Sequence, residues 1–484
     1  MKKRLVSVML CAAMVTSMAA GCGVETVNES SGESSTEADA GSSKAELKGE
    51  GDKEINILIY AQDHEKAVYQ KLIDDFTQAH KDEIKTVNFE VTTQDEYATK
   101  MTAAMTANDL PDIFYVGPDT LRSYVDNGYI QALDGLVDQT AVSNLWPTIV
   151  DAYKYDGTSV GSGSLYCLPK DLSCFAFAYN KDLFDEAGLE YPDPNNPYTF
   201  EQFAEVCQKL TKDKDGDGEI DQWGVANANA FGFTPYVYSN GGSLLNEDQT
   251  KVVITENQNF KEAFQYYTDL TLKYKVTPTV EQDTALGGYQ RWLDGQVGFY
   301  ACGTWDVAAF MDKNTFPYNW DLCGWPVGPS GDGKSATWTA SVGFAISSKT
   351  EYPELCAQLI QSLSTDEEGQ KALCGETTGQ SLQIPNIMDY ANTTFKEKVK
   401  DGTIPYASNV DVIFGYIEGN DKYQGRFSES TYTYNTEWWN LFLEGMPNVL
   451  SGNISVDDYC AQVEPYMQES LDNAIELQNS ATNK

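Results

Sequence analysis

Five acidic side chains alternate along one short loop, and they are the strongest candidates for metal chemistry in this chain of 484 residues. Acids stand at loop positions one, three, five and nine, with Gly218 at position six and an apolar residue at eight. Hard oxygen ligands at this spacing hold calcium in the first part of an EF-hand loop. Position twelve is Gly224, where a bidentate Glu is expected. The sequence therefore predicts a structural calcium site rather than a sensor, with an acidic turn that caps the preceding helix as the alternative. The candidate ligands are Asp213, Asp215, Asp217, Glu219 and Asp221.

Catalytic motifs are missing from the rest of the sequence. His64 and His80 are the only imidazoles, and neither has a partner at the spacing of a transition-metal site. No G-x-S-x-G, Walker loop or G-x-G-x-x-G follows a strand pattern. A pair of carboxylates that hydrolyses glycosides is the remaining catalytic possibility. The sequence favours a binding protein over an enzyme.

The elements that position such residues begin with alternating strand and helix patterns. Strands are predicted at 55–60, 86–93 and 112–116, and amphipathic helices at 63–79 and 95–108. This alternation is typical of a parallel sheet of βαβ units, in which ligands bind beyond the carboxyl ends of the strands. We therefore expect Gln62, Asp63, Gly117 and Asp119 to lie near a binding cleft.

A second α/β region follows from about residue 168. A buried strand is predicted at 175–179, and Asn180 and Thr199 carry the capping signals of two helices that reach Gly188 and Leu210. Later strands are expected at 295–300, 320–325 and 339–347, and helices at 354–363, 436–443 and 456–478. The fold class is therefore α/β, with two such regions.

Composition narrows the possible partners. The chain has 33 Lys and Arg against 72 Asp and Glu, a formal net charge of −39. Nucleic-acid binding and charge-driven attachment to anionic lipid both need a basic surface, so both are excluded. Eight cysteines, from Cys167 to Cys460, lie in apolar contexts without C-x-x-C spacing, and we expect most of them to be buried free thiols.

The first residues carry an export signal. A basic leader precedes an apolar run from Leu5 to Ala20, which is shorter than the roughly 20 residues that span a bilayer. The ending Ala19-Ala20-Gly21-Cys22 resembles a bacterial lipobox, in which the cysteine is acylated after cleavage; an ordinary secretory signal is the alternative. We therefore predict a signal peptide over residues 1–21 and a flexible, lipidated tether over 22–53. The expected location is the outer face of the cell membrane, held by lipid on Cys22.

Six short motifs, taken together, carry a resemblance. They are Leu110-Pro111-Asp112-Ile113, Tyr179-Asn180-Lys181-Asp182-Leu183-Phe184 with Ala187-Gly188, Gly241-Gly242, Gly303-Thr304-Trp305, Gly343-Phe344-Ala345-Ile346 and Thr365-Asp366-Glu367-Glu368-Gly369-Gln370. Each motif is weak alone, but their order and spacing are specific. Through them the chain resembles, from about residue 54 to its end, the extracellular sugar-binding lipoproteins of bacterial ABC importers, relatives of maltose-binding protein.

This resemblance implies a two-lobe, periplasmic-binding-protein-like fold with a hinge and a ligand cleft between the lobes. Lobe one would comprise residues 54–165 and 327–380. Lobe two would comprise residues 166–326 and 381–484. Neither lobe would be continuous in sequence, because the chain crosses between them.

The resemblance also implies where a sugar would bind. Trp305 matches a position whose Trp stacks on sugar, and Asp119 matches a carboxylate that accepts hydroxyl protons. Aromatic rings stack on the apolar faces of sugars, and a few convergent polar groups fix the ligand. For each of these residues the alternative is a core or capping role. The full set of candidates is Asp63, Asp119, Asp171, Phe231, Tyr236, Trp305, Trp338 and Trp438.

The function that this resemblance implies is capture of a neutral oligosaccharide or other carbohydrate by a monomer and its delivery to ABC permease subunits. A secreted glycoside hydrolase or a cell-wall carbohydrate-binding protein is the alternative. The surplus of acids makes anionic ligands less favourable, although one local cation such as Arg291 would reverse that expectation.

Overall fold

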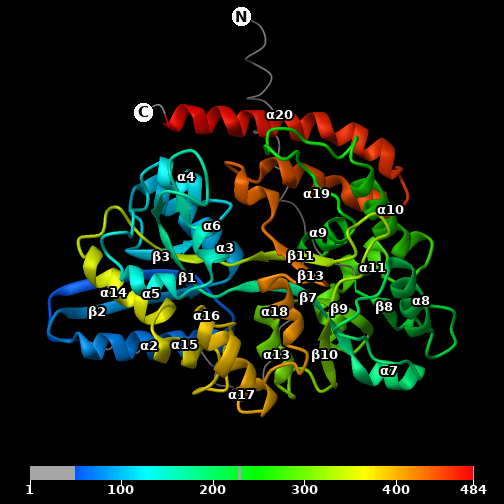
Figure 1. Ribbon diagram of the computed structural model, residues 1–484, viewed down its shortest axis with the longest axis horizontal. Helices are drawn as coiled ribbons and strands as arrows, with labels where there is room; N and C mark the ends of the chain where they lie inside the picture. Colours follow the sequence, from blue (N-terminus) through cyan, green and yellow to red (C-terminus); the bar gives the residue numbers. More distant parts are fainter. Residues whose placement is uncertain (1–48, 227–229, 483–484) are drawn as a thin grey trace, which may run out of the picture. The chain divides into compact units, whose positions relative to one another are not determined.

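Strands and helices alternate through the part of the chain that the computed structural model describes, residues 49–226 and 230–482. The predicted signal peptide, Cys22 and most of the predicted tether lie outside these residues. The segment Glu46–Lys484 forms one compact unit that contains two separate main sheets. Figure 1 shows the first sheet on the left and the second on the right.

The first sheet has five strands in the order β2-β1-β3-β12-β6. β1 is parallel to both β2 and β3, which confirms the predicted parallel βαβ arrangement. β12 is antiparallel to its neighbours β3 and β6. The strands are β1 (Lys53–Tyr60), β2 (Ile84–Thr92), β3 (Ile113–Val116), β6 (Cys167–Pro169) and β12 (Gly343–Ile346).

Helices cover both faces of the first sheet (Figure 1). α2, α14 and α15 contact one another on one side, and α3, α4 and α6 lie on the other. α2 starts with a capping box between Gln62 and Glu65, so its first turn is fixed directly after β1. The helices are α2 (Asp63–Ala79), α3 (Gln94–Ala107), α4 (Leu121–Asp126), α5 (Gln139–Ser143), α6 (Pro147–Ala152), α14 (Pro353–Ser364) and α15 (Glu367–Leu373).

The second sheet runs β13-β11-β7-β9-β8, and β10 also pairs with β7. β7 is buried along its whole length, as its run of apolar residues predicts. Its strands are β7 (Ser173–Asn180), β8 (Trp223–Val225), β9 (Val297–Gly303), β10 (Trp320–Cys323), β11 (Ser335–Ala340) and β13 (Tyr423–Arg426), and a separate small hairpin joins β4 (Lys154–Tyr155) to β5 (Ser164–Leu165).

Two helices of the second α/β region begin at the caps that the sequence predicts. Asn180 caps α7 (Lys181–Ala187), and Thr199 forms a capping box with Gln202 at the start of α8 (Phe200–Leu210). The helices predicted at 436–443 and 456–478 are α19 (Glu437–Leu450) and α20 (Val456–Thr482), and both extend further than predicted. Further α-helices in the described part were not predicted from the sequence, and they are α9 (Ala230–Ser239), α10 (Gln258–Leu272), α11 (Val280–Ala285), α12 (Gly288–Leu293), α13 (Val307–Met311), α16 (Met388–Tyr390), α17 (Lys396–Lys400) and α18 (Asp411–Glu418).

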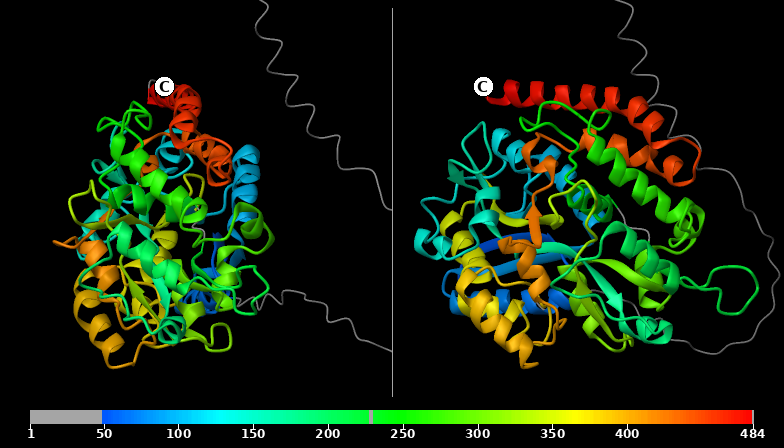
Figure 2. Two further views of the ribbon diagram at one scale, coloured as in Figure 1. Left: turned by 90° about the vertical axis from the view of Figure 1, so that its right-hand side faces the viewer. Right: turned by 45° about the vertical axis from the view of Figure 1, so that its right-hand side comes forward.

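The last helix, α20, contacts helices of both regions of the fold. It packs along α19 and α10, and its far end contacts α4 (Figures 1 and 2). There Arg122 donates to the Gln478 side chain at 3.2 Å, and Gln478 donates to the carbonyl of Thr158 at 3.2 Å. The last helix therefore adds a contact to the first-sheet region besides the strand crossings.

The strand predicted at 339–347 is wrong as a single element. β11 ends at Ala340 in the second sheet, and β12 starts at Gly343 in the first, so the chain crosses between the sheets at Ser341 and Val342. Gly343 has to be glycine because a Cβ there would lie 2.6 Å from Cys167 and 2.9 Å from the Tyr153 ring. The two parts of the predicted strand pair with different partners, because β11 pairs with β7 and β13 whereas β12 pairs with β3 and β6.

Strand pairing places both crossings later in the sequence than the predicted lobe limits. β6 (Cys167–Pro169) still belongs to the first sheet, although the predicted second lobe starts at residue 166. β11 belongs to the second sheet, although the predicted return to lobe one starts at residue 327. The exact lobe limits stay a prediction, and strand pairing places two crossings at residues 170–172 and 341–342.

The cysteine prediction is confirmed within the described residues. All eight cysteines there are buried and none forms a disulfide: Cys167, Cys174, Cys207, Cys302, Cys323, Cys356, Cys374 and Cys460. A core of this size does not need covalent links for its stability.

Candidate functional site

The carboxyl ends of β1 and β3 bring Tyr60 and Asp119 to the same edge of the first sheet. Parallel strands end on one side, so the turn that follows β3 lies beside the end of β1. The half-buried Asp119 folds back over Gly117, where a Cβ would lie 2.4 Å from its Oδ1. A side chain at residue 117 would require the Asp119 carboxylate to shift.

Electrostatic contacts show which groups surround this edge. Burial raises the pKa of Tyr60 to about 12; the charge of Lys170 lowers it, while the charges of Asp119, Asp171 and Glu65 raise it. Burial also raises the pKa of Asp119 above its ordinary value. Hydrogen bonds from the backbone N–H groups of its own turn lower this pKa, but burial has the larger effect. One ammonium and three carboxylates therefore act on one phenol at the end of β1.

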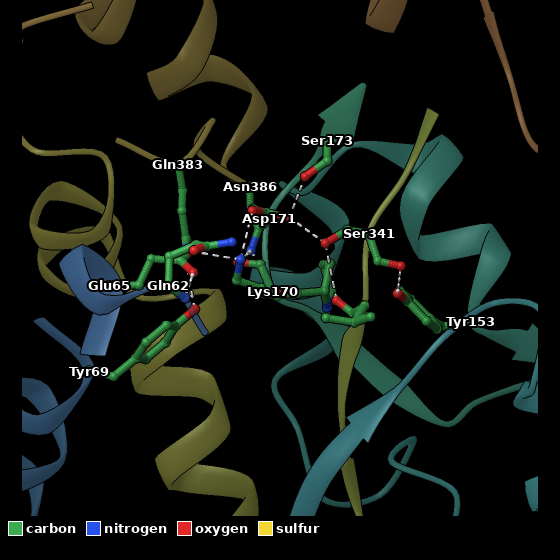
Figure 3. A network of polar contacts seen from close by, with 12 residues as sticks. Gln62, Glu65, Tyr69, Tyr153, Lys170, Asp171, Ser173, Ser341, Gln383 and Asn386 are labelled. Carbon is green, nitrogen blue, oxygen red and sulfur yellow. Dashed lines mark hydrogen bonds and ion pairs between the residues drawn. The ribbon is translucent and has the colours of Figure 1, made fainter. Parts of the chain in front are cut away.

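Lys170 stands at the first crossing, in the centre of a buried polar network (Figure 3). Its Nζ lies 2.7 Å from Glu65 Oε1 and 3.3 Å from Asp171 Oδ2. The three side chains are only 10%, 3% and 4% exposed. Burial by itself would lower the pKa of Lys170, but the charges of Asp171 and Glu65 hold it well above the ordinary value.

The network joins the two crossings to the segment that follows α15. Asp171 accepts from Ser173 Oγ at 3.0 Å and also from Ser341 Oγ, which lies at the second crossing. Gln383 Nε2 donates to Glu65 at 2.7 Å, and Asn386 Nδ2 donates to the Pro169 carbonyl at 2.8 Å. Figure 3 shows these groups converging on Lys170 and Asp171 from three segments of the chain.

Three aromatic rings cluster at the second sheet, close to the same crossings. The ring of Phe175 on β7 lies 4.9 Å from Trp305 and 5.5 Å from Trp338, and the two indoles lie 6.4 Å apart. Phe175 is buried, whereas both tryptophans are half-buried. Trp305 lies over Gly303, where a Cβ would meet its ring at 2.3 Å. A half-buried indole that is packed in this way has a fixed orientation and exposes part of its apolar ring face.

The structure therefore groups part of the predicted ligand set. Asp119 and Asp171 share the surroundings of Tyr60, while Trp305 and Trp338 share Phe175, two residues beyond Ser173 on β7. Sequence reasoning missed both Lys170 and Glu65. The only signal at Glu65 is its place in the Gln62 capping box, which indicates a helix start and not a binding site.

The other predicted ligand residues lie elsewhere. Asp63 is exposed in the first turn of α2. Tyr236 is buried in the core beside Phe177, and Trp438 is 1% exposed with its indole N–H donating to Thr433 at 3.0 Å. Phe231 lies in α9, but its side chain is outside the described part. Tyr236 and Trp438 thus occupy core positions, and any ligand contact by them stays a prediction.

The acidic loop brings together three of its five predicted ligands. One carboxylate oxygen each from Asp213, Asp215 and Asp221 lies within 4.8 Å of the others, and all three residues are exposed. Asp213 accepts from the backbone N–H groups of Gly216 and Gly218, both at positive φ. Asp217 and Glu219 are not in this group of three. The oxygen donors suit calcium chemically.

The sequence of this chain matches a known protein family. The family model for bacterial extracellular solute-binding proteins matches residues 60–370, which is more than half of the chain. The chain belongs to this family. The bacterial solute-binding protein described here is therefore a binding protein and not an enzyme, so the alternative of a glycoside hydrolase is wrong.

Curated relatives of the solute-binding protein match only parts of it. A binding protein of Brucella abortus is 30% identical over 173 residues, 35% of this chain and 39% of its own length. The chain thus spans about two fifths of that relative. The maltotriose-binding protein of Pyrococcus abyssi is 23% identical over 252 residues, 52% of this chain and 49% of its own.

Solved structures match the fold over most of the chain. An ABC substrate-binding protein of Listeria monocytogenes in complex with cycloalternan has a TM-score of 0.72 and 22% identity, covering 87% of this chain and 100% of its own. The MalE domain of Bdellovibrio bacteriovorus bound to maltotriose has a TM-score of 0.66 and 16% identity, with the same coverage. These matches confirm the two-lobe periplasmic-binding-protein-like fold.

Among the described residues, no helix has the length and apolarity to cross a bilayer.

Proposed function

We propose that this solute-binding protein captures a neutral oligosaccharide between its two sheets and delivers it to the permease of an ABC importer. The observation that supports the proposal is the position of half-buried Trp305 and Trp338 around Phe175, which lies two residues beyond Ser173, the residue whose hydroxyl donates to Asp171 at the first crossing. Indoles stack on the apolar faces of sugar rings, and carboxylates accept hydroxyl protons. The carbohydrates bound by the relatives from Pyrococcus, Listeria and Bdellovibrio support the same ligand class.

In this proposal the residues have different tasks. Trp305 and Trp338 provide the stacking surface, and Asp119 accepts hydroxyl protons. Asp171 already accepts from Ser173, Ser341 and Lys170, so it orients the crossings and has little capacity left for ligand. Closure of the two halves on the ligand would then be a shift in population between two hinge states.

The proposal also includes the attachment and the metal. Cys22 would carry the lipid, and residues 23–53 would let the folded part work near the membrane as a monomer. Calcium in the acidic loop would be structural, because the loop lies apart from the indoles and carboxylates assigned to sugar. The oxygens of Asp213, Asp215 and Asp221 support this assignment.

A thermal-shift screen tests the ligand class directly. The purified protein is heated with maltotriose, cyclic glucose oligosaccharides, other neutral oligosaccharides and the sugar alcohol erythritol. A ligand present at 100 times its Kd adds about 2.7 kcal/mol to the stability of the folded state. A rise in melting temperature with one saccharide supports the proposal. No shift with any of them at millimolar concentration would overturn it.

A further inference from the structure

The charged groups around Tyr60 are predominantly negative. Glu65, Asp119 and Asp171 act on this phenol together with the cation of Lys170. Tyr153, whose hydroxyl donates to the Ser341 carbonyl at 2.8 Å, also feels the charges of Asp171 and Asp119. The first-sheet side of the proposed binding site therefore carries a net negative charge.

Lys170 does not offset this charge for an incoming ligand. Its ammonium lies 2.7 Å from Glu65 and 3.3 Å from Asp171, and its side chain is only 10% exposed. An anion that displaced either carboxylate would leave that carboxylate buried without its partner, which is strongly unfavourable. The cation is thus committed to the protein's own acids.

Asp119 is in the opposite situation. It is half-buried, and no cation is among the groups in the described part of the chain that shift its pKa. Only backbone N–H groups of its own turn stabilise the carboxylate, and burial works against them. A ligand at this strand end meets a negative charge that the protein leaves uncompensated.

Two arginines are the obvious candidates to reverse this balance, and both are engaged elsewhere. Arg291 lies over the Trp223 ring at 4.5 Å, and it lines a separate cavity of about 650 Å³ beside Asp221. Arg426 pairs in register with Trp338, but it donates to Glu429 at 3.3 Å. Arg291 is therefore away from the site, and Arg426 is already paired with an acid.

We propose that the binding site selects its saccharide by charge: it accepts neutral and amine-bearing sugars and rejects sugars that carry a carboxylate, with Asp119 as the specificity-determining residue. This inference rests on the proposed function and narrows its ligand class. A like charge brought against a carboxylate in a partly dehydrated site is repelled, whereas an ammonium is attracted. Rejection of the wrong charge is the discriminating element.

The test compares three forms of one saccharide by calorimetric titration. The parent is the neutral saccharide that gives the largest thermal shift, with maltotriose as the first choice. The other two carry a carboxylate or an amine in place of one 6-hydroxyl, at each ring in turn. Both substitutions remove the same hydroxyl, so only the sign of the charge differs between them. We expect the carboxylate form to bind at least about 30-fold more weakly than the amine form at the ring nearest Asp119.

Two variants assign the effect to its residue. Asp119→Asn keeps a hydrogen-bond acceptor and should reduce the ratio between amine and carboxylate affinities by about tenfold or more. Asp109→Asn removes an equal charge from an exposed position just before β3, at the other end of that strand, and should leave the ratio unchanged within about twofold because water screens it. Melting curves verify that both variants are folded.

The possible results distinguish a failure of charge selection from a failure of the proposed function. If no neutral saccharide binds, the proposed function fails and the inference fails with it. If the parent binds but the carboxylate and amine forms bind equally at every ring, charge selection is wrong while the function stands. An equal ratio in folded Asp119→Asn and the wild type would refute the role of Asp119. If Asp119→Asn does not fold, the wild-type ratio alone decides whether charge selection exists.

Discussion

Replacing Lys170 by methionine removes one buried cation and keeps a side chain of similar length. Glu65 would retain hydrogen bonds from Gln383 and from the backbone N–H of Gln62, at 2.7 and 3.0 Å. Asp171 would retain the hydroxyls of Ser173 and Ser341. Both carboxylates would remain buried, but neither would face a positive charge.

The size of the effect follows from that burial. Removing one partner of a buried ion pair costs about 3–5 kcal/mol, because an uncompensated charge stays inside the protein. Glu65 escapes part of this cost by taking up a proton, and each unit of pKa shift is worth about 1.4 kcal/mol. In the wild type, burial alone would raise the pKa of Glu65, but Lys170 and the hydrogen bonds hold it below its ordinary value.

The assay is equilibrium unfolding in urea at pH 5 and pH 8. In the variant, Glu65 is expected to have a raised pKa, so its protonated form favours the folded state and the deficit in unfolding free energy shrinks at pH 5. The matched control is Lys53→Met, because Lys53 lies at the same 2.7 Å from Glu83 but the pair is 31% and 52% exposed. That control should cost much less unfolding free energy than Lys170→Met, because water screens the exposed pair. Equal losses for the two variants would refute the reasoning about burial.

Three further changes test other parts of the structure. Trp305→Ala should weaken saccharide binding at least about tenfold by calorimetry, with a much smaller fractional loss of unfolding free energy, because its ring is half-buried; a fall in stability that accounts for the whole loss of binding would assign Trp305 to the core. Asp306 has its pKa raised to about 7 by burial, so the folded state holds a proton that the unfolded state releases, and stability should fall as pH rises from about 4 to 7. Asp306→Asn should flatten this dependence in urea titrations; an unchanged slope would contradict it. Calcium added after chelation should raise the melting temperature of the wild type, and Asp215→Asn should abolish this rise. No rise in the wild type would exclude the metal site.

Local sequence signals predicted the secondary structure well. The apolar run of β7 and the caps at Asn180 and Thr199 act within a few residues, so their physical causes are visible in the sequence. The division of the predicted strand 339–347 was not visible, because the partners of its two parts lie far away in the sequence. Ala340 pairs with Ser173 on β7, whereas Gly343 pairs with Pro169 on β6 and Val116 on β3.

The candidate site shows the same limit. Family resemblance predicted Asp119 and Trp305 as ligand residues, because motifs fix positions relative to strand ends. The structure places Asp119 near Tyr60 and Trp305 against Phe175, and a sugar contact by either residue stays a prediction. The partners of Lys170 were not predictable, since Gln383 and Glu65 are 318 residues apart in sequence and meet only in the folded chain. Trp438 was predicted to contact the ligand, but the structure places it in the core. The next residue, Trp439, points in a different direction because successive helical residues are about 100° apart.

The unpaired cysteines bear on how the chain reaches its folded state outside the cytoplasm. Since none of the eight described thiols is committed to a covalent link, folding there requires neither an oxidant nor an isomerase, and reductants leave the fold intact. Burial raises the pKa of Cys167 and Cys207 well above the ordinary value, so the reactive thiolate is scarce once the core has formed. Oxidation is therefore a hazard mainly for chains that have not yet folded.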